Sequence, residues 1–326
     1  MNAAMITTRP QSAGLAPMRA VRVHRFGAPD VIALDSVVPP RPGEGEVLVR
    51  VKAAGVGPWD AWIRAGRSVL PQPLPLTLGS DLSGVVEAIG PHVTTFQPGE
   101  AVYGVTNPRF TGACADYAVA SAGMIAGRPA VLDDVHAAAV PVAAVTAWQA
   151  LFEQARVGPG QSVLIHGGAG NVGAFAVQLA HLAEAHVIAT AAARDSGCVR
   201  TLGADRVIDR ATRFEDVVRD IDVVVDLVGE PVQSRSFGVL KPGGVLVSAV
   251  SQPDQERARR SGVRAMFFLV DVTTMHLTRI AEMIDAGDLR SDVGTVLPLA
   301  DACLAHEMLD GTRPHPRGKI VLQVAP

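Results

Sequence analysis

The residues most able to do chemistry lie between positions 162 and 173, where an apolar segment runs directly into closely spaced glycines. The segment reads Ser-Val-Leu-Ile-His, and Gly168, Gly170 and Gly173 have the spacing G-x-G-x-x-G. We expect Gly168 to permit the tight turn, Gly170 to let the backbone approach a pyrophosphate, and Gly173 to let a helix pack on the sheet. The free amides at the start of that helix would then bind the pyrophosphate of a dinucleotide.

The segments after this turn alternate between helical and strand patterns. From Asn171 to Ala183, apolar residues recur at helical spacing, and short apolar runs follow at 186–190, 206–209, 221–228 and 244–250. Apolar strands that alternate with helices predict an α/β fold with a parallel, doubly wound sheet of the Rossmann type. The alternative is a flavodoxin-like sheet whose glycines only turn corners.

Charge indicates which dinucleotide would bind. A Rossmann sheet that selects NAD usually carries Asp or Glu about 20 residues beyond the glycines, where it binds the ribose 2′-hydroxyl. This chain has Thr190 and three alanines there, with Arg194 and Arg210 where the second and third predicted strands end. The missing carboxylate and the two cations favour NADPH. The alternative is that both arginines are solvated surface residues, since the chain has 26 arginines and three lysines.

The composition is typical of a two-domain enzyme. The 326 residues exceed what one hydrophobic core usually serves, and 48% of them are hydrophobic. A net charge of -3 gives no reason to expect nucleic acid as a partner. The three cysteines are far apart and form no C-x-x-C pair, so we expect a reducing, cytoplasmic location. No segment has the pattern of a signal peptide or a membrane span.

Before the glycine turn, short strands separated by Gly and Pro predict a compact, irregular β domain. These strands are expected at 19–24, 46–52, 82–89 and 100–105. Beyond about residue 272 the chain is expected to return to this domain and to end in a strand at 318–324. The predicted organisation is an extension at 1–17, a β domain at 18–142 completed by 272–326, and a dinucleotide-binding domain at 143–271.

An ordered set of motifs extends from Met18 to Val324. It includes Gly55-Val-Gly-Pro-Trp-Asp60, Leu78-Gly-Ser-Asp-Leu-Ser-Gly84, Val145-Thr-Ala-Trp-Gln-Ala-Leu151 and Gly318-Lys-Ile-Val-Leu322. This set resembles the zinc-free quinone oxidoreductases of the medium-chain dehydrogenase/reductase superfamily, the group that includes zeta-crystallin. The resemblance implies a GroES-like fold for the β domain. It also implies a homodimer formed through an edge strand of the nucleotide domain, for which 244–250 is the apolar candidate.

The resemblance further implies which residues contact the cofactor. Thr146 would lie at the nicotinamide end, although its hydroxyl could instead bond its own helix. The other implied contacts are Gly168, Ala169, Gly170, Asn171, Val172 and Gly173 at the pyrophosphate, Thr190, Arg194 and Arg210 on the adenosine side, and Val228, Gly229, Val250, Phe268 and Val270 at the ribose and carboxamide.

The zinc-dependent relatives carry Gly-His-Glu where this chain has Gly79-Ser80-Asp81, and no cysteine cluster occurs. We therefore expect no metal requirement. Without a Lewis acid, hydride transfer suits an acceptor already activated by conjugation, so the predicted activity is NADPH-dependent reduction of a quinone. The alternatives are an enoyl or alkenal reductase acting on an α,β-unsaturated carbonyl, and a non-catalytic NADPH-binding sensor or structural protein.

The catalytic residues cannot be assigned from the sequence. The family usually has Asn where this chain has Gly57, and often has Tyr in the stretch that reads 67–70 here. Asp60 and Arg64 are candidates, although Asp60 also suits a structural role in a turn and Arg64 that of a surface cation. Trp59 and Trp62 could wall an aromatic pocket or belong to the core. The expected partner is a small hydrophobic or conjugated carbonyl compound.

Overall fold

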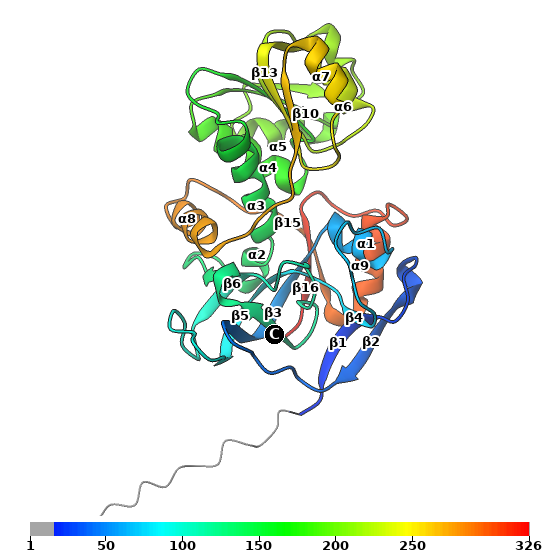
Figure 1. Cartoon of the computed structure of the whole chain (residues 1–326), viewed down its shortest axis with the longest axis vertical. Helices are drawn as coiled ribbons and strands as arrows, with labels where there is room; N and C mark the ends of the chain where they lie inside the picture. Colours follow the sequence, from blue (N-terminus) through cyan, green and yellow to red (C-terminus); the bar gives the residue numbers. More distant parts are fainter. Residues whose placement is uncertain (1–15, 326) are drawn as a thin grey trace, which may run out of the picture.

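The computed structural model describes residues 16–325, which form two lobes joined at a narrower waist (Figure 1). Of the extension predicted at 1–17, residues 1–15 lie outside the described part of the chain. The first predicted strand is present as β1 (Met18–Val23). Within residues 16–325, no helix combines the length and the apolarity needed to cross a bilayer.

The upper lobe is built on a six-stranded parallel sheet, which confirms the Rossmann-type, doubly wound α/β fold. Its strand order is β11-β10-β9-β12-β13-β14, so the chain leaves the central strand β9 toward one edge and later returns to build the other. The elements are β9 (Ser162–His166), α4 (Asn171–Leu182), β10 (His186–Ala191), η4 (Ala193–Asp195), α5 (Ser196–Thr201), β11 (Arg206–Asp209), η5 (Phe214–Asp216), β12 (Ile221–Asp226), α6 (Val232–Ser236), β13 (Leu240–Ser248), α7 (Gln255–Ser261) and β14 (Arg264–Phe267).

The edge of this sheet differs from the prediction. The strand expected at 244–250 is β13, and it lies inside the sheet because β14 pairs with it in parallel from Val245↔Arg264 to Ser248↔Phe267. The edge strand is therefore β14. Its four residues are exposed or half-buried and begin with an arginine, so the apolar pattern of a buried strand is absent.

The lower lobe confirms the irregular, GroES-like β domain. A seven-stranded sheet has the order β15-β16-β3-β5-β6-β8, with β7 paired to β3, and a smaller sheet has the order β2-β1-β4. The strands are β1, β2 (Ile32–Val37), β3 (Glu46–Val56), β4 (Leu76–Thr77), β5 (Asp81–Ile89), β6 (Ala101–Val105), β7 (Tyr117–Ser121), β8 (Ile125–Gly127), β15 (Val293–Pro298) and β16 (Lys319–Gln323). The C-terminal strands β15 and β16 thus join strands from the first third of the chain, while the exact domain boundaries stay a prediction.

Helices pack around this lower sheet and form the waist. They are η1 (Pro29–Val31), α1 (Pro58–Arg64), η2 (Ala122–Met124), α2 (Asp134–Ala137), α3 (Pro141–Trp148), the π-helical turn η3 (Gln149–Gln154), α8 (Thr274–Asp285), η6 (Leu299–Asp301) and α9 (Ala302–Leu309). Both α1 and α3 begin with proline, whose missing N–H and fixed φ suit the first helical position.

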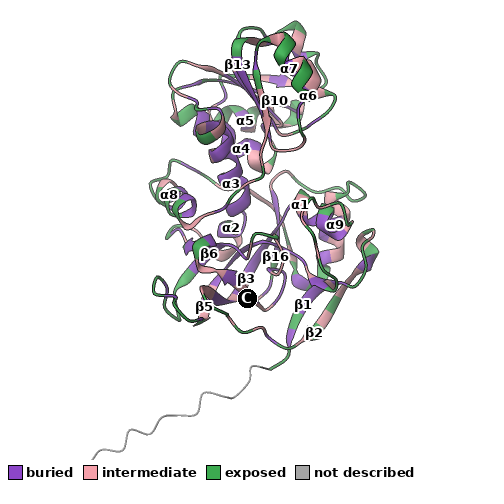
Figure 2. Cartoon of the chain, viewed as in Figure 1, coloured by how far each residue is buried: buried purple, intermediate pink, exposed green. Residues whose placement is uncertain are grey.

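The waist is filled by a core that continues from the upper lobe. One hydrophobic cluster contains residues of β9, α4, α3 and α8 together with Tyr103 of β6, and the burial of α3 is visible in Figure 2. Tyr103 is fully buried and donates its hydroxyl to the Leu277 carbonyl oxygen at 2.6 Å. Its burial also raises the pKa of the phenol. Tyr103 therefore joins β6 to α8 as a core residue.

Candidate functional site

The glycine turn connects β9 to α4. Gly167 has a positive φ of 79°, so the left-handed residue of the turn directly precedes Gly168, the glycine predicted to permit the turn. A Cβ at Gly168 would lie 2.8 Å from the Ala189 Cβ. A Cβ at Gly173 would overlap the Gly167 carbonyl oxygen and lie 2.9 Å from the Gly168 Cα, which explains the glycine there by close packing of helix on turn. Gly170 is the N-cap of α4 and provides no side chain to cap it. The first N–H groups of α4 are therefore free to donate hydrogen bonds to a bound anion.

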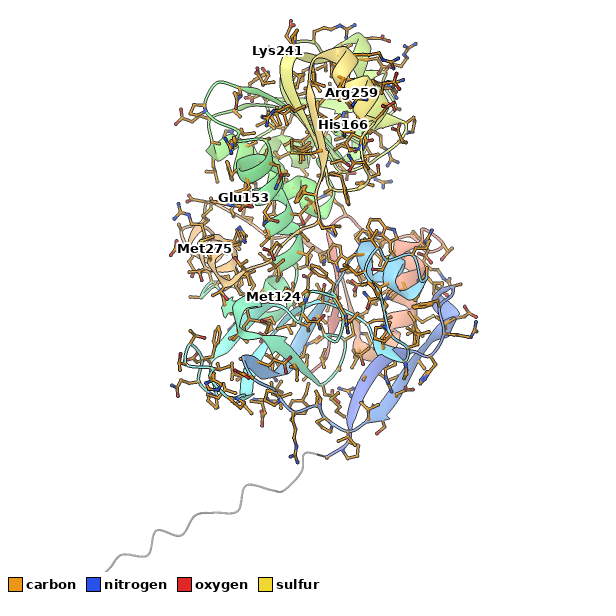
Figure 3. The ribbon with its side chains drawn as sticks, in the orientation of Figure 1. Met124, Glu153, His166, Lys241, Arg259 and Met275 are labelled. Atoms are coloured by element: carbon orange, nitrogen blue, oxygen red, sulfur yellow. The ribbon has the colours of Figure 1, made fainter. Side chains whose placement is uncertain are left out.

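A buried polar network supports the turn from beneath. Thr190 Oγ1 accepts from the Gly167 N–H at 3.2 Å and lies 3.3 Å from His166 Nδ1. His166 Nε2 lies 3.0 Å from Ser236 Oγ, whose hydroxyl donates to the Val232 carbonyl oxygen. Burial lowers the pKa of His166 to about 4, so the imidazole is neutral at physiological pH; it lies within the upper lobe (Figure 3). Nε2 then carries the proton and Nδ1 accepts from Thr190.

The other predicted cofactor residues gather at the same edge of the sheet. Arg194 and Arg210 follow the neighbouring strands β10 and β11, and the Arg210 N–H donates to the Ala191 carbonyl oxygen. The remaining predicted contacts follow β12, β13 and β14, namely Val228, Gly229, Val250, Phe268 and Val270. In open α/β sheets, ligands bind outside the carboxyl ends of the strands.

One buried carboxylate, missed by the sequence analysis, organises part of this edge. Asp226 ends β12, and its Oδ1 accepts from the N–H groups of Val228 and Gly229 at 3.0 and 2.8 Å. Its Oδ2 accepts from Gln233 Nε2 and Ser248 Oγ, both at 2.9 Å. An acidic residue at the end of an otherwise apolar strand was the available signal.

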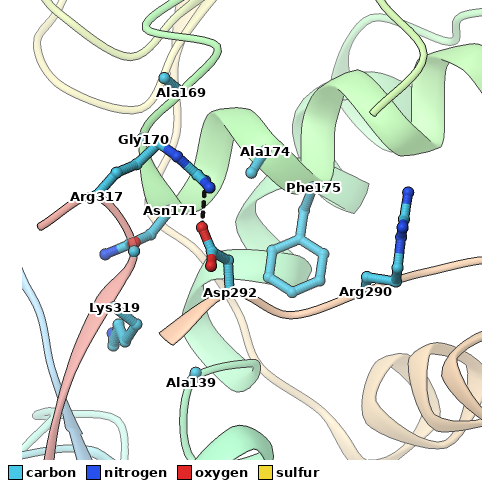
Figure 4. Close-up of a pocket in the computed structure, with 11 residues that line it drawn as sticks. Ala139, Ala169, Gly170, Asn171, Ala174, Phe175, Arg290, Asp292, Arg317 and Lys319 are labelled. Atoms are coloured by element: carbon cyan, nitrogen blue, oxygen red, sulfur yellow. Dashed lines mark hydrogen bonds and ion pairs between the residues drawn. The ribbon is translucent and has the colours of Figure 1, made fainter. Parts of the chain in front are cut away.

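The turn lines a pocket together with residues of the returning C-terminal segment (Figure 4). On the turn side the pocket is lined by Ala169, Gly170 and Asn171, and on the other side by Arg290, Asp292, Arg317 and Lys319. Arg317 forms an ion pair with Asp292. The uncapped start of α4 therefore lies near Arg317 and Lys319, each paired with a carboxylate, while Arg290 lies farther along α4 and donates to the Thr201 carbonyl oxygen. Free helix amides beside basic side chains favour a bound anion. Sequence reasoning missed these residues because they follow the glycines by more than a hundred positions.

Beside this pocket lies a buried charged cluster. Lys319 and Asp81 are at most 1% exposed and form an ion pair of 2.8 Å. Asp81 also accepts from the Val142 N–H at the start of α3 (3.1 Å), so this pair connects β5 and β16 to the helix that bears Thr146. The Lys319 ammonium in turn lies over the ring of Trp59, 4.3 Å from its centroid. A lysine inside a predicted apolar strand was the signal for this cluster.

Asp60 belongs to the same cluster. Its Oδ2 accepts from the Gly57 N–H at 2.7 Å, and among residues 16–325 its buried Oδ1 has no hydrogen-bond partner. Burial raises the pKa of Asp60 to about 7, and the Lys319 charge opposes that rise only in part. The carboxyl can therefore hold a proton near neutral pH.

The second catalytic candidate, Arg64, occupies a different environment. Its guanidinium is 2% exposed, donates to the Gly27 carbonyl oxygen and forms a 2.7 Å ion pair with Asp310 beyond α9. It is thus not the solvated surface cation that the sequence suggested as an alternative. These contacts hold α1 against α9, and the structure does not bring Arg64 to the pocket beside the glycine turn.

Thr146 lies one helical turn inside α3 and is 6% exposed. Its hydroxyl donates to the Val142 carbonyl oxygen at 2.6 Å. This is the bond to its own helix that the sequence analysis gave as the alternative to a cofactor contact. The proton is therefore used within the helix. The oxygen keeps acceptor capacity, so Thr146 can accept from an amide but is not free to donate.

Comparison with known proteins places this geometry in a family. Residues 43–130 match the model described as alcohol dehydrogenase GroES-like domain, and residues 202–322 match the model described as zinc-binding dehydrogenase. A quinone oxidoreductase of Sus scrofa is 33% identical over 324 residues, which cover 94% of this chain and 97% of that protein. The chain belongs to the quinone oxidoreductase group of the medium-chain dehydrogenase/reductase family.

Two further relatives extend the comparison. The solved structure of the quinone oxidoreductase from Coxiella burnetii superposes with a TM-score of 0.88 at 33% identity, covering 94% of this chain and 99% of that one. A 2-haloacrylate reductase of Burkholderia sp. is 32% identical over 323 residues, covering 90% of this chain and 95% of that protein. As a member of this family the chain is an oxidoreductase, and proteins of the family bind a nicotinamide cofactor.

The residues fit such a cofactor. The glycine at position 173 lets α4 pack closely on the turn, and no side chain caps the amides at the start of the helix. Within the described residues, no group of three or more His, Cys, Asp or Glu side chains is placed to hold a metal ion. Although one matching family model carries zinc in its description, metal independence stays a prediction for this chain.

Proposed function

We propose that this protein is an NADPH-dependent, zinc-independent reductase that transfers hydride to a quinone. The observation that carries the proposal is the uncapped start of α4, which opens into a pocket lined by both the glycine turn and the cationic C-terminal segment. The site therefore joins dinucleotide recognition by the upper lobe to residues that belong to the lower lobe.

In this proposal the chain binds the cofactor, orients it against the acceptor and excludes water from the site. The amides of residues 171–173 bind the pyrophosphate, with Arg317 adding positive charge, and Thr146 Oγ1 accepts from the carboxamide. When bound, the reduced nicotinamide supplies the hydride. The residues after β12 and β13 hold the ribose, positioned by Asp226. The reduced acceptor is an anion that takes its proton from solvent or from the buried Asp60 carboxyl.

The preference for NADPH rests on the ends of β10 and β11. Thr190 points into the network below the turn, and the following residues through Ala193 carry no carboxylate. Arg194 is 84% exposed, and its nearest ion pair, with Asp195, is a long contact of 3.8 Å. Replacing Arg194 and Arg210 together by Ala should weaken NADPH binding about tenfold or more while NADH binding changes little. Arg259→Ala, on the exposed side of α7, is the matched control, and unchanged discrimination in the double variant would refute the preference.

Reduction of an α,β-unsaturated carbonyl is the second candidate. It is favoured by the similarity to a 2-haloacrylate reductase, whose name describes a reaction at a conjugated double bond. The hydride chemistry is the same, so the two candidates differ only in the acceptor that fits.

The deciding experiment follows NADPH oxidation by absorbance in chelator-treated protein. The acceptors are 1,4-benzoquinone, 1,4-naphthoquinone, an alkyl enone, a 2-haloacrylate and an enoyl thioester. Quinone turnover supports the main proposal, and a strong preference for the conjugated acids or ketones supports the second. Activity that is lost on chelation and restored by zinc would contradict metal independence.

We further infer a homodimer with β14 as the candidate edge, because of the two edge strands in the described sheet, β11 and β14, it is the one beside the segment 244–250 that the resemblance indicated. A mass measurement in solution, with Met266→Pro as the disrupting variant, tests this. The three free cysteines suit the cytoplasm, the location we propose.

A further inference from the structure

Gly57 and Trp59 are built as a pair. Gly57 has a φ of -131°, an ordinary extended value that any residue adopts, so backbone freedom does not explain the glycine. A Cβ at this position would lie 2.5 Å from Trp59 Cζ2 and 2.6 Å from Cζ3. The indole thus occupies the space that any side chain at position 57 would need.

Trp59 is held in this position by contacts at its edge and on one face. Its Nε1–H donates to Ser80 Oγ at 2.9 Å, and the Lys319 ammonium lies over the ring. Lys319 is itself fixed by Asp81. An ammonium over the face of an indole is attracted to the ring, and the attraction is stronger where water is excluded. The ring plane is therefore set by two buried partners.

The indole also lies at the junction between the two lobes. Trp59 is only partly buried and packs against the hydrophobic cluster of the waist and upper lobe. Its partner Lys319 lines the pocket beside the glycine turn. By contrast Trp62, three residues further along α1, is 41% exposed and belongs to none of these contacts.

We propose that Trp59 is the residue that selects flat, conjugated acceptors, with Gly57 as the position that makes room for it. This rests on the proposed reductase function and names its specificity determinant. The Lys319 ammonium lies over the ring and Trp59 is only partly buried; in this proposal a flat acceptor stacks on the part of the indole that is left exposed. Offset stacking of this kind adds to simple burial of area, whereas an acyclic acceptor gains only the burial.

The first test compares kcat/KM for 1,4-naphthoquinone with that for an acyclic alkyl enone. Trp59→Leu keeps an apolar side chain but removes the plane, and Gly57→Ala displaces the indole by adding one methyl group. Both variants should lower the naphthoquinone-to-enone ratio about three- to tenfold, the range that aromatic stacking supports. Trp59→Phe should keep most of the ratio, and Trp62→Leu is the control on the same helix. A ratio that is the same in all variants overturns the inference.

A second readout does not depend on turnover. In a Trp62→Phe/Trp148→Phe background, Trp59 is the remaining tryptophan, and its fluorescence reports directly on acceptor binding. We expect quenching by naphthoquinone to saturate, and the saturable part to disappear when Gly57→Ala is added. Purely linear quenching overturns the inference. Saturable quenching without NADPH oxidation by any acceptor would keep Trp59 as a binding surface and refute the reductase function instead.

Discussion

Asp60 offers the sharpest test of the buried charge cluster. In the folded chain its pKa is raised to about 7 from an ordinary 3.8, because the carboxyl is buried and only one of its oxygens has a hydrogen-bond partner in the described structure. The folded state therefore keeps the proton between pH 4 and 7 while the unfolded chain loses it. The stability that this carboxyl contributes is present below pH 4 and is lost as the pH rises to about 7.

This difference between the folded and unfolded pKa of Asp60 corresponds to a loss of about 4 kcal/mol in the free energy of unfolding between pH 4 and pH 8. Asp60→Asn keeps an oxygen that can accept from the Gly57 N–H but cannot ionise, so this dependence should vanish. Free energies of unfolding would be measured by urea titration of both proteins across this pH range. Subtracting the two curves removes every other titrating group.

Asp30→Asn is the matched control, since this carboxylate is 74% exposed and lies in η1, outside the buried cluster. As the pH rises, the wild-type protein should lose stability relative to the Asp60→Asn variant. The wild-type protein and the Asp30→Asn variant should change in parallel. Parallel curves for wild type and Asp60→Asn would refute the reasoning. They would mean that Asp60 is ionised in the fold and that its charge is balanced by Lys319.

Three further outcomes follow from the site. Gly173→Val places a side chain against the Gly167 carbonyl and should weaken both NADPH and NADH at least tenfold in a fluorescence titration; unchanged affinity would remove α4 from the cofactor site. Arg317→Ala should likewise weaken both dinucleotides, unlike the double variant at Arg194 and Arg210, and a loss confined to NADPH would contradict its placement at the pyrophosphate. Arg64→Met removes a buried guanidinium from the partly exposed Asp310 and from the Gly27 carbonyl, and should cost about 1–3 kcal/mol of stability with little change in kcat per folded molecule; full stability with kcat abolished would make Arg64 catalytic.

Local sequence patterns were sufficient for the elements that are proposed to bind the cofactor. Strands such as β9 and β12 are buried on both faces, so each appears as a continuous apolar run, and the glycines stand directly between one such run and a helical pattern. The same logic failed at β14, whose exposed arginine and half-buried residues lack that pattern. It also attributed the tight turn to Gly168 alone, because the glycine spacing does not reveal that the positive φ lies at Gly167.

The acceptor side depended on contacts that no local pattern contains. Lys319 meets Asp81 across 238 positions of sequence, and Arg317 reaches the glycine turn only because β16 pairs with β3 in the lower lobe. The environments of Asp60 and Arg64 are set by burial, which turns one into a carboxyl that holds its proton and the other into a structural cation. The sequence by itself determined the Rossmann sheet, its glycine turn and the family, because those features are local and periodic. Only the tertiary structure decided which charges are buried together and what occupies the space at Gly57, because desolvation and close packing arise between segments that the chain brings together on folding.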